Sequence, residues 1–368
     1  MTDTTTRWLK WENDVIGTID ANDNVHFSQP NYNEVVTLYT HGTTYWPNER
    51  FVEFLSERIV NRNRRDIERI LFRCGLSHFD VLQIARITRG VNPKDLLWVA
   101  HSKDEQFNEA ITSVFDSVFN QQVDMVGESI DTPEGCNIKR YGVYDGRYGI
   151  FKQRISPLST DVESEVAVYL LSQKLGVPCC PATRVDKDLV FSTFLYDFSQ
   201  EYIVHFRRLF KGARGNNEYQ NLVAVRPQFE DDIARMILLD FVTRQDDRHL
   251  SNIAIKISHR FDTSSYGETF YPLYDNGRSL FYEDTEVMVH EAIANPTKFA
   301  TSFGFTGTYW DYAKEIAERR GTIAGLVNLN ISEDEVHAIL LEAGFEGYRL
   351  FGATKWIAKT LELLRGFE

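Results

Sequence analysis

The chain has 368 residues, of which 43% are hydrophobic and 25% charged, and its formal net charge is −13. This length allows two or three domains with cores of their own, and the composition is that of an ordinary globular protein. The negative charge argues against a general binder of nucleic acid or of anionic membranes, although it leaves room for a local basic patch.

The sequence also predicts where the protein resides. It begins without a basic segment followed by an apolar run, and its apolar stretches are shorter than a membrane span. The cysteines show no Cys-x-x-Cys spacing, and two adjacent ones do not easily form an unstrained disulfide or a zinc site. We therefore expect a cytoplasmic protein whose thiols are buried and reduced. The cysteines are Cys74, Cys136, Cys179 and Cys180.

Residues 1–122 are expected to form an accessory region in which short strands precede helices. Val15–Ile19 and Val25–Phe27 have the composition of strands and flank a turn of small polar residues. Apolar residues recur at helical spacing from Phe51 onward, and Phe107–Phe119 is predicted to close the region as a helix.

Residues 79–98 contain two short apolar segments on either side of Arg89-Gly90. Two helices around such a turn could form a helix-turn-helix that reads DNA. Because no basic face accompanies the pattern, a docking module for the following domain or for a protein partner is the favoured interpretation. We expect DNA to be contacted indirectly, if at all.

A hairpin and a helix begin the second predicted domain, residues 123–200. Residues with the alternating pattern of β-strands flank Asp145-Gly146, a pair typical of a tight hairpin turn. The second strand ends at Lys152. A lysine late in a strand is more often a solvated edge residue than a ligand. Here a helix follows, with acidic residues in its first turns, an apolar stripe and a stop at Gly176. Strand, lysine and glutamate-bearing helix in this order are typical of a kinase small lobe, in which the glutamate fixes a phosphate-binding lysine.

Two glutamates could be the partner of Lys152. Glu163 and Glu165 lie two positions apart and therefore on different faces of the helix. We favour Glu165, since it directly precedes the apolar stripe.

The rest of this domain is predicted to be β-structure. Ala182–Val185 and Leu189–Phe191 are expected to pair around a short polar turn. The segment after them would be the hinge whose backbone groups meet adenine, and it contains Thr193, Phe194 and Leu195.

The third predicted domain, residues 201–368, is expected to turn helical at Tyr202. Its most apolar helix is Phe229–Val242, and a helix that is apolar on most sides is usually part of a core. Trp310 and Trp356 are expected to anchor apolar faces of later helices.

The stretch Asp247 to Asn252 follows that helix and carries the chemistry. Two strands, Ile253–Ile257 and Phe270–Tyr274, are expected to form a hairpin that returns Asp275 to the side of Asn252. Asp247 could then accept a hydroxyl proton while the amide oxygen of Asn252 and the carboxylate of Asp275 hold Mg²⁺. Because 53 residues are acidic, a solvated loop is the alternative, and the lysine–glutamate lobe before the stretch favours a phosphoryl-transfer site.

These motifs together resemble the HipA-like serine/threonine kinase family, the bacterial group that contains the HipA toxins and the CtkA-type kinases. Asp247, His249 and Asn252 match the D-x-H-x-x-N pattern of the family, and Tyr274-Asp275 matches its Tyr-Asp metal motif. The match is firmest over residues 126–290. By resemblance, Asp247 is the catalytic base, Asn252 and Asp275 are the metal ligands, and His249 lies near the nucleotide.

The phosphate loop of the family has the form S-x-x-G-x-x-x-K, with a serine that autophosphorylates. Thr132, Gly135 and Lys139 stand at those spacings, with threonine in place of the serine. The resemblance therefore implies that these residues and Lys152 bind the phosphates of ATP, and that Thr132 is a possible site of autophosphorylation.

The resemblance also implies a fold and partners. The fold would be α+β and two-lobed, like a protein kinase, with a small β-rich lobe, a helical large lobe and an N-terminal accessory helical domain. The first 122 residues resemble an accessory region found on some HipA-like chains rather than HipA's own amino-terminal part. The cofactors would be ATP and Mg²⁺, the substrate a protein with a serine or threonine hydroxyl, and the partner an antitoxin or another regulatory protein.

The same hexapeptide resembles the motifs of phosphoinositide, aminoglycoside and choline kinases. A lipid kinase needs a basic segment after Asp275 to meet anionic headgroups, and this chain has the acidic run Tyr282–Glu286 instead. A small-molecule kinase more often has a histidine two residues before the aspartate, where Gln245 stands. A protein kinase is therefore favoured, with a small-molecule or lipid kinase, or a nucleotide-binding inactive partner protein, as alternatives.

Overall fold

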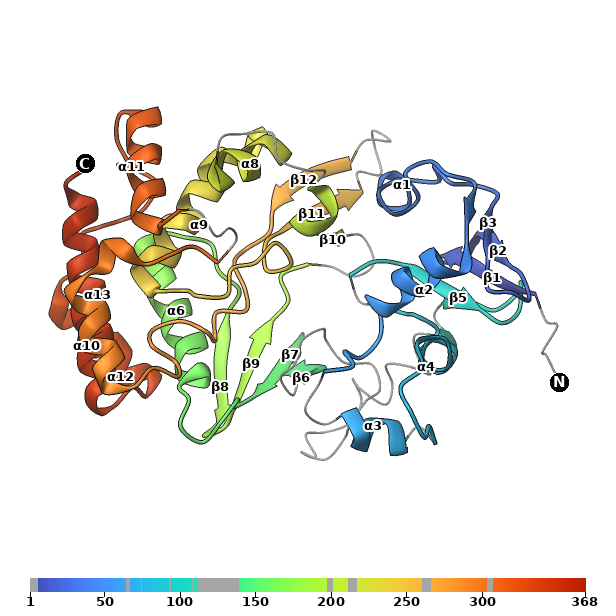
Figure 1. The fold of residues 1–368 in the computed structure, drawn as a ribbon, viewed down its shortest axis with the longest axis horizontal. Coiled ribbons are helices and arrows are strands. Elements are labelled where there is room, and N and C mark those ends of the chain that lie inside the picture. Colours follow the sequence, from blue (N-terminus) through green and yellow to red (C-terminus); the bar gives the residue numbers. More distant parts are fainter. Residues whose placement is uncertain are drawn as a thin grey trace. The chain divides into compact units, whose positions relative to one another are not determined.

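The computed structural model describes residues 6–63, 67–73, 75–92, 94–107, 109–110, 139–196, 201–210, 217–259, 266–302 and 307–368. They divide into two compact units (Figure 1). Unit 1 is Met1–Lys152 with Tyr196–Tyr202, and unit 2 is Gln153–Leu195 with Ile203–Glu368. The predicted boundary after residue 122 lies outside the described residues, so the division into three domains stays a prediction.

Unit 1 contains a five-stranded sheet in the order β4-β3-β2-β1-β5. Its neighbouring strands pair antiparallel, and β1 pairs with both β2 and β5. The strands are β1 (Arg7–Trp11), β2 (Asp14–Ile19), β3 (Val25–Phe27), β4 (Tyr45–Trp46) and β5 (Leu97–Ala100), and the helices are α1 (Glu34–Thr40), α2 (Asn48–Ser56), α3 (Ile67–Arg73) and α4 (Val81–Thr88). The strands expected at Val15–Ile19 and Val25–Phe27 are confirmed.

Of the two short helices expected within residues 79–98, the first is confirmed as α4 and the second is wrong, which removes the helix-turn-helix alternative. After α4 the chain turns through Arg89 and Gly90, which both have positive φ, and then forms β5 in place of a second helix. All four residues of β5 are buried, and the strand pairs with β1, far away in the sequence. A buried arginine, Arg58, holds this turn. It forms a bidentate ion pair with Asp95, with hydrogen bonds of 2.7 and 2.8 Å, and donates a hydrogen bond of 2.6 Å to the carbonyl of Gly90. Long-range pairing therefore decides the structure of a segment whose local pattern suggested a helix.

The hairpin expected around Asp145-Gly146 is confirmed. It consists of β6 (Lys139–Tyr144) and β7 (Arg147–Gln153), which pair antiparallel. Asp145 and Gly146 have φ of 49° and 69°, the left-handed values that a two-residue turn of type I′ requires.

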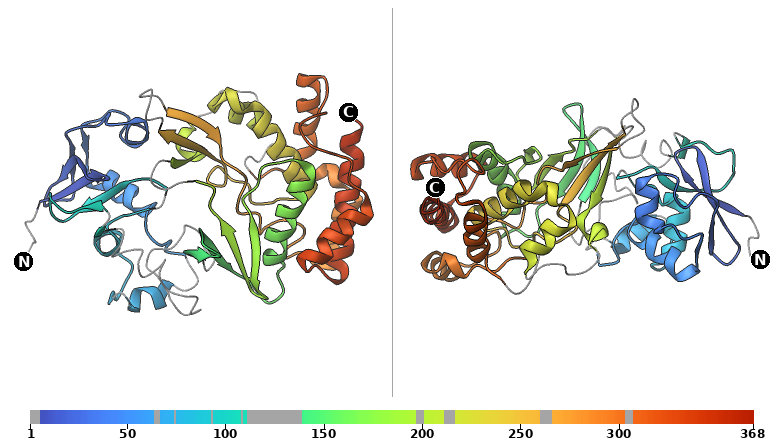
Figure 2. Two further views of the ribbon diagram at one scale, coloured as in Figure 1. Left: turned by 180° about the vertical axis from the view of Figure 1, so that it is seen from behind. Right: turned by 90° about the horizontal axis from the view of Figure 1, so that it is seen from above.

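In unit 2 the expected helix and strand pair are also confirmed. Helix α6 (Asp161–Leu175) ends at Gly176, which has a φ of 72°. It packs through Val162 against the hairpin of β8 (Ala182–Asp186) and β9 (Leu189–Thr193), as Figures 1 and 2 show.

The segment at Tyr202 is a strand, so the helix expected to start there is wrong. Strand β10 (Glu201–His205) lies beside β11 (Ala254–His259) in a sheet of order β10-β11-β12, and its residues from Ile203 onward belong to unit 2. The hairpin partner of β11 is β12 (Tyr266–Phe270), which ends four residues before the expected Tyr274. Pro272 has no N–H to continue the ladder, and the backbone of Leu273 instead forms a parallel bridge with Cys179.

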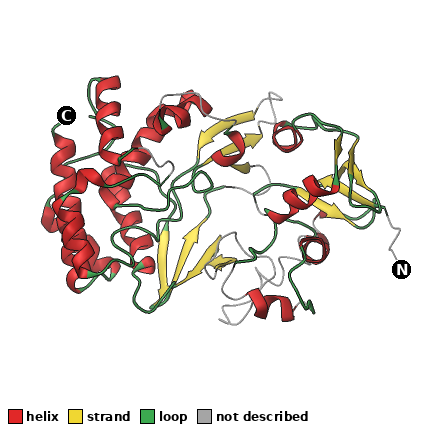
Figure 3. Cartoon of the chain, in the orientation of Figure 1, coloured by secondary structure: helices red, strands yellow, loops and turns green. Residues whose placement is uncertain are grey.

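The helices of unit 2 enclose its main core (Figure 3). Helix α9 (Glu230–Thr243) is buried along most of its length, as its apolar sequence predicts. The indole of Trp356 donates to the carbonyl of Phe241 at 3.0 Å, and Trp310 stacks on Phe367. The other elements are α7 (Phe206–Leu209), α8 (Glu218–Val225), α10 (Glu286–Ala294), α11 (Tyr309–Arg320), α12 (Glu333–Ala343) and α13 (Gly347–Arg365).

Two further expectations concern burial. Cys179 and Cys180 are free and buried, as predicted for the part of the cysteine set that the structure describes. Among the described residues, no helix is both long and apolar enough to cross a membrane.

Candidate functional site

The loop Asp247–Asn252 is shaped by the end of α9 and by its own backbone. Arg244 ends the helix with a φ of 51° and redirects the chain. Within the loop, the N–H of His249 donates to the carbonyl of Asp247 at 2.9 Å, and the N–H of Asn252 donates to the carbonyl of His249 at 2.7 Å. Asp247 and Asn252 are therefore the two ends of one tightly bonded turn.

Arg248 lies at the centre of the site and is fully buried. Its guanidinium donates to the carbonyl of Asn252 at 3.2 Å and to the carbonyl of Tyr274 at 2.7 Å. It also donates to Oδ1 of Asn276 at 2.6 Å. One side chain thus joins the loop that holds Asp247 to the turn that holds Asp275.

The charge of Arg248 is balanced by Asp240, on the preceding helix. Nε and Nη2 of Arg248 each lie 3.0 Å from a different carboxylate oxygen of Asp240, the two-pronged geometry that is strongest for such pairs. Burial acts to lower the pKa of the guanidinium, but the carboxylate outweighs it, so the pKa of Arg248 lies above its ordinary value. Burial also raises the pKa of Asp240, and the charge of Arg248 opposes that rise.

Two neutral side chains add further links between the same segments. Gln245 is buried, and its amide accepts from the N–H of Asp247 at 2.9 Å while donating to the carbonyl of Asp275 at 3.2 Å. The hydroxyl of Tyr274 donates to the carbonyl of Ser251 at 2.8 Å. These contacts place the Tyr274-Asp275 turn beside the Asp247–Asn252 loop, as the sequence predicts.

The oxygen atoms of Asn252 and Asp275 suit a hard cation. Nδ2 of Asn252 donates to the carbonyl of Asp247 at 2.8 Å, which makes Oδ1 the end of the amide that a metal could use. An amide oxygen and a carboxylate are donors that Mg²⁺ accepts, and Mg²⁺ usually takes its other ligands from phosphates and water. Among the described residues no group of three or more His, Cys, Asp or Glu is placed to hold a metal. A metal here would therefore need phosphate and water oxygens.

Glu165 lies beside the same turn. A Cβ placed on Gly277 would be 3.4 Å from Oε1 of Glu165 and 3.4 Å from the carbonyl of Asp161, so glycine leaves room for the start of α6. The hydroxyl of Ser164 donates to the carbonyl of Ser279 at 2.8 Å and fixes this approach. Glu165 is buried.

Glu163 has a different environment. It forms a two-pronged ion pair with Arg154 at 2.7 and 2.8 Å and a second ion pair with Arg184. Because two arginines already balance its charge, Glu163 is a poor partner for a further cation, and this supports the choice of Glu165. The ion pair between Lys152, in unit 1, and Glu165, in unit 2, stays a prediction.

The hairpin of unit 1 brings two of the predicted phosphate-binding residues together. The β6–β7 register places Lys139 directly opposite Lys152, and residues in that relation share one face of the hairpin. Both side chains are only 8% exposed. Like charges placed opposite one another repel, and an anion bound on that face would offset the repulsion between these two.

The other predicted nucleotide contacts lie in the expected hinge and in the loop that contains His249. The N–H of Thr193 donates to the carbonyl of Pro181 at 2.9 Å, and the N–H of Leu195 donates to the hydroxyl oxygen of Tyr271 at 3.0 Å. A hinge contact to adenine at Phe194 stays a prediction. The imidazole of His249 accepts from the N–H of Ser251 at 3.2 Å, so it shapes the loop from within. Thr132 and Gly135 lie outside the described residues.

Asp246 and Asp247 share one cation, Arg278. Nε of Arg278 lies 3.3 Å from Oδ1 of Asp246, and Nη1 lies 3.7 Å from Oδ1 of Asp247. Burial raises the pKa of Asp246 to about 6, although Arg278 and Arg244 oppose that rise.

The sequence motifs predict a base and metal ligands, and they do not predict the buried residues that hold this loop and turn together. Arg248, Asp240 and Asn276 were not singled out, and Gln245 was noted only for not being histidine. One signal was present: Asp240 is a single acid among Ile237, Leu238, Leu239, Phe241 and Val242. A carboxylate in such a core requires a cation, and the arginine of the next loop supplies it.

Comparison with known proteins bears on the fold of the chain. No protein-family model and no curated protein sequence matches the chain. Among solved structures, it is similar to HipA in the toxin–antitoxin complex of HipA, HipB and operator DNA from Shewanella oneidensis MR-1, with a TM-score of 0.54 and 13% identity over 98% of this chain and 97% of that chain. It is also similar to the Helicobacter pylori proinflammatory kinase CtkA, with a TM-score of 0.47 and 14% identity over 64% of this chain and 90% of that chain.

The chain has a HipA-like kinase fold. The fold expected from the sequence is therefore confirmed. The alignment with HipA extends over nearly all of this chain, so it includes residues of the region 1–122, which sequence reasoning had set apart from HipA.

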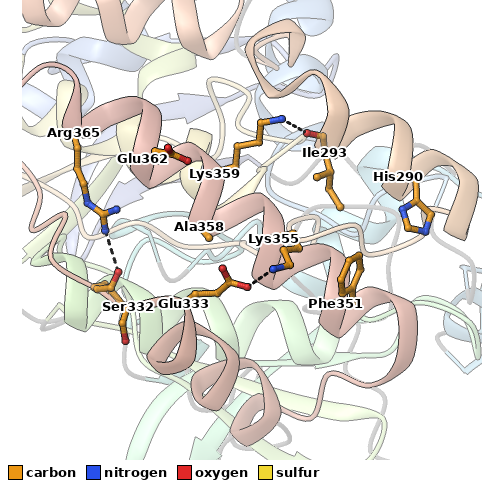
Figure 4. A pocket seen from close by; sticks show the side chains of 11 residues that line it. His290, Ile293, Ser332, Glu333, Phe351, Lys355, Ala358, Lys359, Glu362 and Arg365 are labelled. Carbon is orange, nitrogen blue, oxygen red and sulfur yellow. Dashed lines mark hydrogen bonds and ion pairs between the residues drawn. The ribbon is translucent and has the colours of Figure 1, made fainter.

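Unit 2 also contains a hollow that is not part of this site. It has a volume of about 700 Å³ and lies among α10, the start of α12, and α13 (Figure 4). Two lysine side chains that line it have partners within the protein: Lys355 pairs with Glu333 at 2.6 Å, and Lys359 donates to the carbonyl of Ile293 at 2.9 Å. None of the predicted site residues lines it.

The role of Arg248 can be measured by its removal. Arg248→Met leaves Asp240 buried without its cation, so we expect the free energy of unfolding to fall by about 3–5 kcal/mol. Asp240→Leu combined with Arg248→Met removes both charges and should regain part of that loss. Arg320→Met, which breaks an exposed pair with Asp231, should cost less than about 1 kcal/mol. Free energies of unfolding would be measured by denaturant titration. Equal losses for Arg248→Met and Arg320→Met would contradict the role of Arg248.

The raised pKa of Asp246 predicts a pH dependence. Between about pH 4 and pH 6 the folded protein retains a proton that the unfolded chain has released, so this group lowers stability as pH rises through that window. Asp246→Asn removes the effect and should gain roughly 1 kcal/mol over wild type between pH 4 and pH 7, after allowance for partial exposure to solvent. Melting temperatures across this range would test it, with the exposed Asp334→Asn as control. A constant difference between Asp246→Asn and wild type would refute the prediction.

Proposed function

We propose that the chain is a kinase that uses ATP and Mg²⁺ to phosphorylate a serine or threonine hydroxyl of a protein. The observation that carries this proposal is the set of contacts through which Arg248 joins the Asp247–Asn252 loop to the Tyr274-Asp275 turn. A proton acceptor and two cation-binding oxygens are thereby held in one rigid cluster, which is the requirement of phosphoryl transfer.

Each residue then has a role that its position allows. Asp247 orients the acceptor hydroxyl and takes its proton. Oδ1 of Asn252 and the carboxylate of Asp275 hold Mg²⁺, which when bound supplies positive charge to the phosphates. Lys139 and Lys152 donate to phosphate oxygens from one face of their hairpin. Glu165 positions Lys152, in the manner of the lysine–glutamate pair of protein kinases.

A protein is favoured as the acceptor over a lipid or a small molecule. The segment that follows the turn contains Glu283 and Asp284 and would repel an anionic headgroup. Gln245 is fully buried and bonded at both ends of its amide, so it supports the loop and does not reach a substrate. The alternatives of a small-molecule or lipid kinase rest on the shared hexapeptide alone.

Autophosphorylation of Thr132 is a second part of the proposal. Its support is the spacing of Thr132, Gly135 and Lys139 in the sequence. A phosphate on Thr132 would add about −1.5 to −2 charge to the loop and drive it away from the nucleotide. Phosphopeptide mapping after incubation with ATP tests this, and an active enzyme without modified Thr132 would refute it.

A regulatory partner is the third part. The solved structure with which this chain aligns over most of its length is that of HipA with the antitoxin HipB and operator DNA. We propose that this chain likewise binds an antitoxin or another regulatory protein in the cytoplasm, and that any contact with DNA passes through that partner. Support for this part is the fold alone.

The central test of the activity is Asp247→Asn. Loss of a positioned base should lower the rate of phosphoryl transfer to protein in a cell extract by roughly 10²–10⁴. The rate would be measured with labelled ATP, and ATP binding would be followed by calorimetry. Asp334→Asn, an exposed change in α12, should retain the wild-type rate.

Three outcomes separate the alternatives to this proposal. A variant as fast as wild type would refute the role of Asp247. Wild-type protein that binds ATP without transferring phosphate would favour an inactive partner protein. Label found on a lipid or a small molecule rather than on protein would show that the acceptor is assigned wrongly.

A further inference from the structure

We propose that Arg278 is a catalytic residue of this kinase, whose guanidinium contacts the phosphoryl group as it passes from ATP to the acceptor. The inference rests on the proposed function and adds to it a residue that no sequence motif singles out. It depends on where Arg278 lies, what holds it there, and what remains exposed.

Arg278 follows the metal-binding turn and reaches back to the catalytic loop. Its carbonyl accepts from the N–H of Asp246 at 3.1 Å, which fixes its backbone against that loop. Its guanidinium carbon lies 5.2 Å from the centre of the Tyr282 ring, so the side chain rests on an aromatic face. From there it forms ion pairs with Asp246 and with Asp247, at 3.3 and 3.7 Å.

The distance to Asp247 locates Arg278 relative to the reaction. Asp247 takes the proton of the acceptor hydroxyl, and the oxygen of that hydroxyl attacks the terminal phosphorus of ATP. The transferred phosphoryl group must therefore lie next to the acceptor oxygen, within a few ångströms of the base. A guanidinium 3.7 Å from the base carboxylate is within reach of the same group.

The chemistry of a guanidinium allows both contacts at once. Arginine has five N–H donors in a fixed plane, so one edge can retain a carboxylate while another donates to a phosphoryl oxygen. In the step itself the acceptor oxygen forms a bond to phosphorus, the bond from phosphorus to the bridging oxygen breaks, and ADP leaves with that electron pair. Asp247 gains the proton, and Arg278 stays protonated throughout and contributes hydrogen bonds and charge.

The local charge also requires such a cation. Asp246 and Asp247 are adjacent carboxylates, and an anionic phosphoryl group that approaches them is repelled unless a positive charge lies between. Arg278 already contacts both carboxylates and can offset that repulsion. Arg278 thus has a position in which it lowers the cost of approach and stabilises charge in the transition state.

Two other arginines near the loop are committed to structure. Arg248 is fully buried within its network, and the guanidinium of Arg244 lies over the ring of Phe281 at 4.4 Å and pairs with Asp284 at 2.9 Å. The side chain of Arg278, by contrast, is 43% exposed. It can reach a substrate without leaving a buried site.

The test compares Arg278→Met and Arg278→Lys with a control, Arg235→Met, which alters a partly exposed arginine on α9 that pairs with its neighbour Asp232. We expect Arg278→Met to lower kcat for phosphoryl transfer by roughly 10²–10³, the cost of losing one donor to transition-state charge. The Kd for ATP should change by less than about threefold, because the contact is made in the transition state. Arg278→Lys should recover part of the rate, and millimolar guanidinium should raise the rate of Arg278→Met but not that of wild type or of the control.

Several results would overturn the inference. A kcat for Arg278→Met near that of wild type would show that the side chain takes no part, and a raised kcat would show that the pair with Asp247 restrains the base. A loss explained by lower melting temperature, without rescue by guanidinium, would show a structural role. These outcomes assume transfer by wild type. If wild-type protein binds ATP and transfers nothing, the proposed function fails, and the inference fails with it.

Discussion

A single buried ion pair, Asp240 with Arg248, determines whether this site exists. Asp240 belongs to the most buried helix of unit 2, and Arg248 to the loop that follows it. The pair by itself is a doubtful source of stability, because removing two charges from water costs about as much free energy as their attraction returns. Its value lies in geometry: Asp240 holds one edge of the guanidinium, and the other donors bind the carbonyls of Asn252 and Tyr274 and the amide oxygen of Asn276. The core of the fold thereby positions the loop and the turn that carry Asp247, Asn252 and Asp275, the residues proposed as base and cation ligands.

The predicted site residues are held by different means in each unit. In unit 2, loops without regular structure are held by buried side-chain contacts, since a loop has no ladder of its own to fix it. In unit 1, the two lysines of the hairpin are placed by strand register, and the left-handed turn at Asp145 and Gly146 sets that register. Gly277 contributes in a third way, because its lack of a side chain leaves room for Glu165 beside the turn that follows Asp275.

The sequence predicts those parts of the protein in which the deciding residues are close together. The spacing of Asp247 to Asn252, the hairpin that ends at Lys152 and the helix that carries Glu165 depend on local patterns. Strands β5 and β10 were not predicted, because each is defined by pairing with a strand distant in the sequence. Arg248 was missed for a related reason: an arginine within an acidic, polar stretch has the composition of a solvated loop, and its burial depends on how α9 and the Tyr274 turn meet around it.

A crystal structure of the protein with Mg²⁺ and a non-hydrolysable ATP analogue is the most direct test of the central claim. The account predicts a metal ion bound by Oδ1 of Asn252 and the carboxylate of Asp275, with the terminal phosphate facing Asp247. Arg248 should retain its contacts to Asp240 and to both carbonyls, because the site is formed before the nucleotide arrives. A nucleotide bound elsewhere, or a metal that avoids Asn252 and Asp275, would contradict the account.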